Sequence, residues 1–449
     1  MPRAYRPYER TPLLTEDGRR LLQQLEEHPN KPQFNDHCGD FLTAAGLDQV
    51  RAFQRRLLGA AGGWLPGEKP AWLEAYAAEL ADKVPFFRSR ASQPARFEDL
   101  PFTSRADLSR APEAFVPDDL PLDDLIRFNT SGATGHPLTV VSHPVVASLH
   151  LPLIQTALEW RGARMQGGPG RVAMAMVCFQ KTTITCASIS AVLDQAGFVK
   201  VNLDPGDWKH PDDRARFLDA CAPEVYSGDP LSFAELMRLP LTQRPKALIS
   251  TSMALQPGFH QALEAHFNCP VIDLYSLNET GPVAAGVPGR QMILPHQLYV
   301  EIIDPQGNPC PPGVRGEVTL TGGFNPYVPL LRYRTGDWAS LDFQGRQPLL
   351  VDLEGRLPVV FYTPQGQAVN NIDVTILLKP YALAQFNLHQ AADGRLTLTY
   401  LPAGPVDEAR LRHSLEILFG PQQALTIQQR AAPLDGGSKQ LQYTTEMPL

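Results

Sequence analysis

Between residues 170 and 275, apolar runs of strand length alternate with stretches of helical periodicity. Strands are expected at 171–177, 199–203, 246–250 and 271–275, and helices at 184–196, 212–221 and 259–267. This alternation predicts an α/β unit built on a largely parallel sheet. In an open sheet of this kind, ligands bind beyond the carboxyl ends of the strands, so residues that follow a strand are candidates for a site.

The flanking segments differ in pattern and suggest three domains. Residues 1–62 are expected to form a helical N-terminal extension, since Val50, Phe53 and Leu57 recur at helical spacing. Residues 63–353 are expected to form the large domain, in which strands at 298–304 and 316–321 predict an antiparallel β-subdomain after the α/β part. Residues 354–449 have the strand and helix content of a small α+β C-terminal lobe, large enough to fold as a unit.

Charge and composition exclude several classes of protein. The net charge of −7 argues against nucleic acid or an anionic membrane as a partner, and no run approaches the 18 or so apolar residues of a membrane span. The N-terminus lacks an apolar signal core, so we expect a cytoplasmic protein. The six cysteines form no C-x-x-C pair and are expected to be buried free thiols.

The stretch 129–137, Asn-Thr-Ser-Gly-Ala-Thr-Gly-His-Pro, follows an expected strand at 125–128. Its glycines allow a tight turn, and its hydroxyls and backbone N–H groups can donate to anionic oxygens, which is the chemistry of a phosphate-binding loop. It fits neither G-x-x-x-x-G-K-[ST] nor G-x-G-x-x-G. An ordinary polar turn is the alternative.

Two carboxylates follow strands further along the chain. Glu279 comes just after the strand at 271–275, where it could hold Mg²⁺ on a nucleotide phosphate, because hard cations take carboxylate oxygens. Asp337 lies in Arg-Tyr-Arg-Thr-Gly-Asp, and a carboxylate in such a turn can accept both hydroxyls of a ribose. The alternatives are a solvated loop acid at 279, and a plain turn at 337 with Arg332 and Arg334 on an exposed strand face.

Two basic residues in the last hundred residues are further candidates for contacts with a nucleotide or a transferring group. Arg356 stands at the junction with the last lobe and could reach a ribose or a phosphate. Lys439 follows Gly436-Gly437-Ser438, and from such a flexible turn it could stabilise charge on a transferring group. An ordinary exposed lysine is the alternative for Lys439.

In this order, the motifs resemble those of the adenylate-forming superfamily of acyl-CoA synthetases, adenylation domains and luciferases, and among them most the phenylacetate–CoA ligase family. The resemblance runs from about residue 64 to the end. Its most specific piece, 329–337, reads Pro-Leu-Leu-Arg-Tyr-Arg-Thr-Gly-Asp. The segments 100–108 (Leu-Pro-Phe-Thr-Ser-Arg-Ala-Asp-Leu) and 300–305 (Val-Glu-Ile-Ile-Asp-Pro) also resemble segments of that family.

The resemblance implies a fold, a site and a set of ligands. The fold would be a large adenylate-forming domain with a small mobile C-terminal lobe, and the ligands would be ATP, Mg²⁺ held by Glu279, a carboxylic acid and coenzyme A. Lys439, Glu279 and Thr134 would be catalytic. The nucleotide would be bound by Thr130, Ser131, Gly132, Thr134, Gly135, Ser252, Met253, Tyr275, Ser276, Asn278, Glu279, Thr280, Asp337 and Arg356, with Tyr275 stacked on the adenine. The acyl group would lie near Phe179, Gln180 and Ile184.

The implied activity is the conversion of an acid, aryl or related, to acyl-AMP with release of pyrophosphate, followed by transfer to a thiol, most simply that of coenzyme A. Transfer to a carrier protein or an amine is an alternative, as is a relative that binds nucleotide without full turnover; a homodimer is also left open. The chain departs from the family pattern in the loop, where His136 and Leu138 take the places at which relatives carry a lysine, and after Arg356, where Leu357-Pro358 replaces an acidic pair. The cysteine that some relatives carry after Glu279 is missing, and His296 stands alone, so no zinc is expected.

Overall fold

The computed structural model describes residues 7–59, 63–90, 96–129, 138–255, 257–354, 359–378, 380–381, 383–402, 405–430 and 443–447. The helices are α1 Pro7–Arg10, α2 Glu16–Glu26, α3 Ala44–Gly59, α4 Leu73–Lys83, α5 Pro85–Arg88, α6 Arg105–Arg110, α7 Pro144–Ser148, α8 His150–Glu159, α9 Asp213–Cys221, α10 Pro230–Leu236, α11 Pro257–Phe267, α12 Asn371–Leu378 and α13 Glu408–Phe419. Short 3₁₀ turns lie at Phe97–Asp99, Pro112–Phe115 and Pro205–Asp207.

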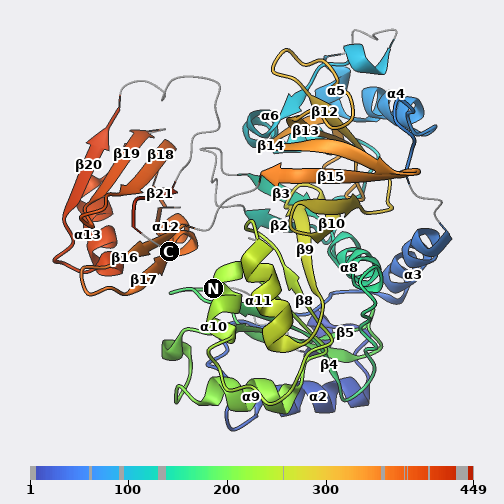
Figure 1. Cartoon of the computed structure of the whole chain (residues 1–449). Coiled ribbons are helices and arrows are strands. Elements are labelled where there is room, and N and C mark those ends of the chain that lie inside the picture. The colour runs from blue at the N-terminus through green and yellow to red at the C-terminus, as the bar shows by residue number, and fades with distance from the viewer. Residues whose placement is uncertain are drawn as a thin grey trace.

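One sheet of 13 strands runs through the described part of the large unit (Figure 1). Its path is β12 Leu298–Ile303, β13 Gly316–Gly322, β14 Leu330–Gln344, β15 Gln347–Glu354, β11 Arg290–Ile293, β10 Gly281–Val287, β9 Val271–Leu277, β8 Ala247–Ser250, β7 Val225–Gly228, β4 Val172–Cys178, β6 Ala196–Asn202 and β5 Cys186–Ser190, with β1 Thr103–Ser104 beside β14. A separate hairpin pairs β2 Ile126–Asn129 with β3 Thr139–Ser142.

The pairing of neighbouring strands changes from parallel to antiparallel along the sheet. Strands β6, β4, β7, β8 and β9 are parallel neighbours, and from β9 onward the path through β10, β11, β15, β14, β13 and β12 is antiparallel. The predicted parallel α/β part and the predicted antiparallel part are therefore both present, joined in a single sheet. The fold class is α/β, as the alternation at 170–275 indicates.

Helices cover both faces of the parallel part. Leu248 points to a core shared with α2, α9, α10 and α11, and its neighbour Ile249 points to the opposite core shared with α3 and α8. Successive strand residues point to opposite faces, so a strand covered on both sides is apolar throughout. Residues 7–59 thus contribute helices to both cores of the sheet, α2 to one and α3 to the other. The boundary predicted at residue 62 lies outside the described residues.

The expected helix at 184–196 is wrong. Residues 186–190 form β5, which pairs antiparallel with β6 from Cys186↔Lys200 to Ser190↔Ala196. The connection between the two strands turns at Asp194 and Gln195, both with positive φ (50° and 67°). Tight hairpins favour such left-handed residues because their twist matches that of the flanking strands.

The expectation of free thiols is wrong for two of the six cysteines. Cys38 and Cys186 form a disulfide, with their Cα atoms 6.0 Å apart and a sequence separation of 148. Cys178, Cys221, Cys269 and Cys310 are free. The spacing of the cysteines carries no signal for the pair, because the disulfide joins a loop before α3 to the edge strand β5.

The C-terminal residues have their own sheet and core. The strands are β18 Leu383–Gln390, β19 Leu396–Pro402, β20 Leu425–Gln429 and β21 Tyr443–Thr445, in the order β20-β19-β18-β21, with a hairpin of β16 Val360–Tyr362 and β17 Ala368–Asn370. Phe361, Leu388, Leu411 and Phe419 are buried together there. Figure 1 shows this α+β lobe to one side of the large unit.

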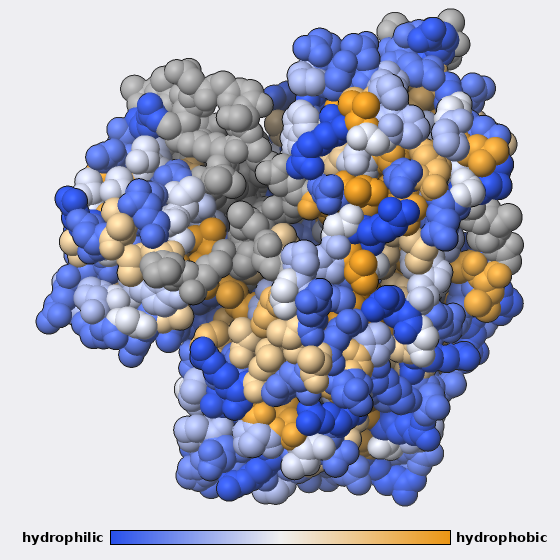
Figure 2. All heavy atoms as spheres, in the orientation of Figure 1, coloured by the Kyte–Doolittle hydropathy of each residue, from blue (hydrophilic) through white to orange (hydrophobic). Residues whose placement is uncertain are grey.

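The surface in view is dominated by hydrophilic residues, and hydrophobic ones occur in small groups between them (Figure 2). Within the described residues, none of the helices combines the length and apolarity that a membrane span requires.

Candidate active site

Three sequence segments that carry the predicted motifs converge beside β14. Strand β1 pairs parallel with β14 through Thr103↔Tyr333 and Ser104↔Arg334, and the Thr103 hydroxyl donates to the Leu331 carbonyl at 2.8 Å. The residue after β1, Arg105, lies 3.5 Å from the Glu279 carboxylate. The motif segments at 100–108, 275–281 and 329–337 are thereby brought into one place.

Arg332 is buried and links β14 to Glu301 and to the segment 98–102. It is 1% exposed, its guanidinium lies 3.3 Å from Glu301, and it donates to the Leu100 carbonyl at 3.0 Å and stacks 4.1 Å from the Phe102 ring. The alternative of an exposed strand face is therefore wrong for Arg332. Arg334 is partly exposed and is paired with Glu317.

Glu279 is a buried carboxylate, 4% exposed, and not a solvated loop acid. Tyr333 of β14 donates its hydroxyl to Glu279 Oε1 at 2.6 Å, and Arg105 faces the same oxygen. Burial and the adjacent Glu279 charge hold the pKa of Tyr333 well above its ordinary value, so the phenol remains a donor.

Asp337 is also a buried carboxylate that accepts a hydrogen bond from a tyrosine. It is 8% exposed, and Tyr275 of β9 donates its hydroxyl to Asp337 Oδ2 at 2.8 Å. The turn before it is fixed by Gly336, whose φ of 75° suits glycine, and by the Asp337 N–H, which donates to Thr335 Oγ1 at 3.0 Å. Burial, with the Asp337 charge next, raises the pKa of Tyr275 well above its usual range.

The two tyrosine–carboxylate pairs are crossed. Tyr275 of β9 binds the aspartate of β14, and Tyr333 of β14 binds the glutamate that follows β9. The charge of Glu279 also acts on Tyr275, and that of Asp337 on Tyr333, so the four side chains form one electrostatic group. The result is two fixed carboxylates at the point where β9 ends.

A divalent cation fits the donor set at Glu279. Both contacts of the carboxylate within the described residues use Oε1, so Oε2 makes no hydrogen bond with that part of the chain. Mg²⁺ is commonly held by one or two carboxylates together with substrate phosphates. No group of three or more His, Cys, Asp or Glu among the described residues could hold a metal on its own.

Residues at the ends of β8 and β9 are linked across the sheet. Thr251 and Ser276 share a hydroxyl hydrogen bond of 3.2 Å. Ser252 is exposed with φ of 71°, while Met253 is buried. After β9, Asn278 is exposed, and Thr280 is buried and donates its hydroxyl to the Gly281 carbonyl. Their predicted contacts with a nucleotide stay predictions.

Of the three residues predicted to lie near the acyl group, two line one cavity and the third does not. Phe179 and Gln180 follow β4 and line a cavity of about 250 Å³ that the C-terminal lobe closes with Tyr362 and Asp373. Ile184, however, is 52% exposed and outside that lining, because the chain leaves the cavity on its way to β5.

The remaining candidates lie outside the described residues. They are Thr130, Ser131, Gly132, Thr134 and Gly135 of the loop, together with His136, Arg356, Pro358 and Lys439. Sequence reasoning missed Arg105, Tyr333 and Asp373 as contact residues. Arg105 and Tyr333 belong to motif segments that it quoted, but only the pairing of β1 with β14 shows what they touch.

His296 has a structural setting. Its Nε2 is 3.0 Å from the Pro282 carbonyl, its ring lies edge-on to Phe324, and burial lowers its pKa to about 4. His150 packs on the same phenylalanine and also has a pKa lowered by burial to about 4.

No protein-family model matches this chain, and no curated protein does. Solved structures do. A 2-hydroxyisobutyryl-CoA ligase in complex with 2-HIB-AMP and CoA is 18% identical over 90% of this chain and 91% of that one, with a TM-score of 0.48. An amide bond synthetase from Marinactinospora thermotolerans is 17% identical, with coverages of 95% and 98% and a TM-score of 0.40.

The O-succinylbenzoate coenzyme A synthetase from Bacillus subtilis, in complex with AMP, is 15% identical over 70% of this chain and 67% of that one, with a TM-score of 0.37. The chain is therefore similar to ligases and synthetases along most of its length. Nothing in these comparisons singles out phenylacetate–CoA ligases.

Proposed function

We propose that this protein activates a carboxylic acid with ATP, forming acyl-AMP and pyrophosphate, and then transfers the acyl group to the thiol of coenzyme A. The observation that carries the proposal is the crossed pair of tyrosine-held carboxylates, Tyr275–Asp337 and Tyr333–Glu279. They lie beyond the carboxyl end of β9, where open α/β sheets bind nucleotides. The motif order from 129 to 439 supports the same function.

In the first step, a carboxylate oxygen of the acid attacks the α-phosphorus of ATP, and the bond to the pyrophosphate oxygen breaks. The chain's part is mainly to position and to neutralise charge. Asp337, fixed by Tyr275, accepts the ribose hydroxyls. Glu279, fixed by Tyr333, provides the carboxylate for Mg²⁺, which when bound would offset phosphate charge. The loop at 130–135 and Lys439 are proposed to hold the phosphates and the developing charge.

In the second step, the sulfur of coenzyme A attacks the acyl carbon, and the bond to the AMP oxygen breaks, so that AMP leaves and the thiol proton passes to solvent. The acid is proposed to lie at the cavity beside Phe179 and Gln180. A thioester results because acyl-AMP is a mixed anhydride and a far better acyl donor than the free carboxylate.

The test is ATP–pyrophosphate exchange over a panel of aryl, indolyl and fatty acids. We expect exchange with at least one acid, and a loss of at least about tenfold in Glu279→Gln and Asp337→Asn, since a charged hydrogen bond contributes about 1.5–3 kcal/mol. Asp342→Asn, at a half-exposed aspartate on the same strand β14, serves as the matched control and should retain exchange.

Absence of exchange with every acid would overturn the proposal. Exchange that is equally strong in Asp337→Asn and Asp342→Asn would remove Asp337 from the site. Acyl-AMP that persists after coenzyme A is added would instead identify a carrier protein or an amine as the acceptor.

A further inference from the structure

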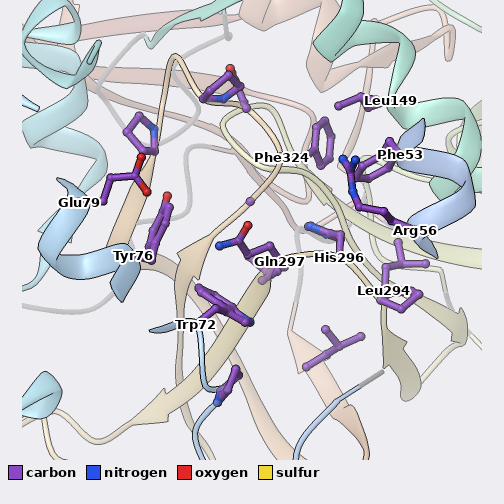
Figure 3. A pocket seen from close by; sticks show the side chains of 18 of the residues that line it. Phe53, Arg56, Trp72, Tyr76, Glu79, Leu149, Leu294, His296, Gln297 and Phe324 are labelled. Atoms are coloured by element: carbon purple, nitrogen blue, oxygen red, sulfur yellow. The ribbon is translucent and has the colours of Figure 1, made fainter. Parts of the chain in front are cut away.

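A second cavity of about 970 Å³ lies away from the candidate active site. Its lining comes from α3, α4, the connection between β11 and β12, and residues 323–326 (Figure 3). Glu279, Asp337 and Tyr275 are not part of this lining. In Figure 1, α3 and α4 are on the opposite side of the large unit from the C-terminal lobe. The volume is at the upper end of the range for small-molecule sites.

The walls of the cavity are largely apolar and aromatic. Phe53, Leu149, Leu294 and Phe324 form one side, and Trp72 and Tyr76 the other, with Gln297 between them (Figure 3). Trp72 and Tyr76 meet edge to face at 5.7 Å, so that side is a fixed aromatic surface. Apolar walls of this kind accept an apolar body, and a few polar groups set its orientation.

Among the basic side chains that line the cavity, one has no acidic partner among the described residues. Three of its four lysines and arginines are paired with acids: Lys69 with Glu98 at 2.6 Å, Lys83 with Glu79 and Asp119 at 2.9 Å, and Arg346 with Glu68 at 3.0 Å. Arg56 has no acidic partner in the described part of the chain. Its guanidinium lies beside the cavity, 5.7 Å from the Phe53 ring.

The side chain of Phe324 lies between the cavity and the segment that follows Glu279. Phe324 lines the cavity and packs so closely on Gly281 that a Cβ there would lie 2.4 Å from its ring. Gly281 comes two residues after Glu279. A ligand in the cavity would therefore contact Phe324, which packs on the first residue of β10, without reaching Glu279 itself.

We propose that this cavity is a binding site for a small amphipathic carboxylate, whose aryl or alkyl body lies between the aromatic walls and whose anionic group pairs with Arg56. The site is separate from the one proposed for ATP and the acid undergoing activation. A carboxylate is favoured over a cation because the acids of the lining are already paired, and over a neutral molecule because the unpaired guanidinium gains a partner.

The test is calorimetric titration, without ATP, of 4-phenylbutyrate and of the matched alcohol 4-phenyl-1-butanol. The carboxylate is expected to bind at least about tenfold more tightly than the alcohol, in keeping with a charge-assisted hydrogen bond. Arg56→Gln should remove that advantage. Its matched control is Arg55→Gln, the neighbouring arginine, which is exposed like Arg56 but lies outside the lining, and this change should alter affinity less than about twofold by the same reasoning.

Trp72→Ala should weaken both probes, which separates the apolar contribution from the charge, and equal unfolding midpoints establish that each variant is folded. Equal affinity for acid and alcohol, or equal loss in Arg56→Gln and Arg55→Gln, would overturn the proposal. So would loss of 4-phenylbutyrate binding in Phe179→Ala with retention in Arg56→Gln, because the acid would then be occupying the cavity proposed for the acid that is activated. Failure of ATP–pyrophosphate exchange leaves this outcome unaffected.

Discussion

At the scale of single residues, Arg332 is expected to matter for stability beyond any role of its motif in nucleotide binding. Arg332→Met leaves Glu301 buried with no cation, and breaking a buried ion pair costs about 3–5 kcal/mol. The control Arg290→Met removes a pair with Asp342 in which both side chains are about half exposed, and should cost no more than about 1 kcal/mol. Urea unfolding measures both. Equal losses would contradict this account of Arg332.

Asp273 gives a residue-scale prediction of pH dependence. It is buried on β9 and accepts from Gln291 Nε2 at 2.7 Å, and burial raises its pKa from 3.8 to about 7. Between these two values the folded chain keeps a proton that the unfolded chain has lost, so this residue's contribution to stability falls as pH rises from about 4 to 7 and is constant above.

Asp273→Asn cannot titrate, so its unfolding free energy relative to that of the wild type should rise between pH 5 and pH 8. The expected rise is about 3 kcal/mol, because pH 5 lies two units below the folded pKa of about 7 and each unit corresponds to about 1.4 kcal/mol. The histidines with lowered pKa values are present in both proteins and cancel in the comparison. Asp342→Asn, at a half-exposed position, should show no such rise. A constant difference between wild type and Asp273→Asn would contradict the buried, protonated carboxyl.

The sequence identified Glu279 and Asp337 as candidate carboxylates because each follows or lies within a recognisable motif. It could not identify what holds them, since Tyr275 and Tyr333 stand four residues from their own motif's acid and bind the acid of the other motif. Which tyrosine binds which acid depends on the relative positions of β9 and β14 in the folded chain. The burial of Arg332 could not be predicted for the same reason, because it comes from residues 98–102 and Glu301.

At the scale of elements, four of the five parallel strands were predicted, whereas the parallel strand β7 and the edge strand β5 were not. Strands such as β4 and β8 are buried on both faces and therefore show as short apolar runs. Strand β5 has the sequence Cys-Ala-Ser-Ile-Ser, which carries no strong preference, and its pairing with β6 decides its structure. The hairpin turn at Asp194-Gln195 lacks the usual glycine, so the signal for a turn was weak.

The edge strand is also held by the disulfide, which leads to a prediction at this scale. The chain before α3 runs beside β5, where Asn35 N–H donates to Thr185 O and Ala191 N–H donates to Asp40 Oδ2, and Cys38–Cys186 lies between these contacts. Cys38→Ser should lower the unfolding free energy by about 2–5 kcal/mol, the usual effect of losing a native disulfide.

The matched control is Cys310→Ser, which removes a free thiol. Thermal unfolding with and without dithiothreitol measures the effect. Reductant should lower the midpoint of the wild type to that of Cys38→Ser and leave Cys38→Ser unchanged. A wild-type midpoint that does not respond to reductant, in samples shown to be fully reduced by thiol titration, would contradict a stabilising disulfide.

At the scale of the whole molecule, the C-terminal lobe is attached to the large unit at the proposed acyl cavity. Asp373 Oδ1 accepts from Lys181 N–H at 2.6 Å and the backbone of Thr182 also bonds this carboxylate, while Asn370 Nδ2 donates to the Phe179 carbonyl at 3.4 Å. The carboxylate of one lobe therefore binds consecutive backbone amides of the other. The mobility predicted for this lobe requires that this contact can open.

Asp373→Ala removes the acceptor and should favour the open arrangement, whereas Asp373→Asn keeps a side-chain oxygen that can still accept from the amides and should resemble the wild type. Hydrogen–deuterium exchange of the peptide containing Lys181 and Thr182 measures the contact directly, because both amides lose protection when it opens. We expect at least about tenfold faster exchange in Asp373→Ala, which corresponds to about 1.4 kcal/mol and is within the range for a hydrogen bond to a charged group. Small-angle scattering should show a larger radius of gyration in the same variant. Unchanged exchange and unchanged scattering in Asp373→Ala would mean that the lobe is held by other contacts, and that Asp373 does not control access to the cavity at Phe179.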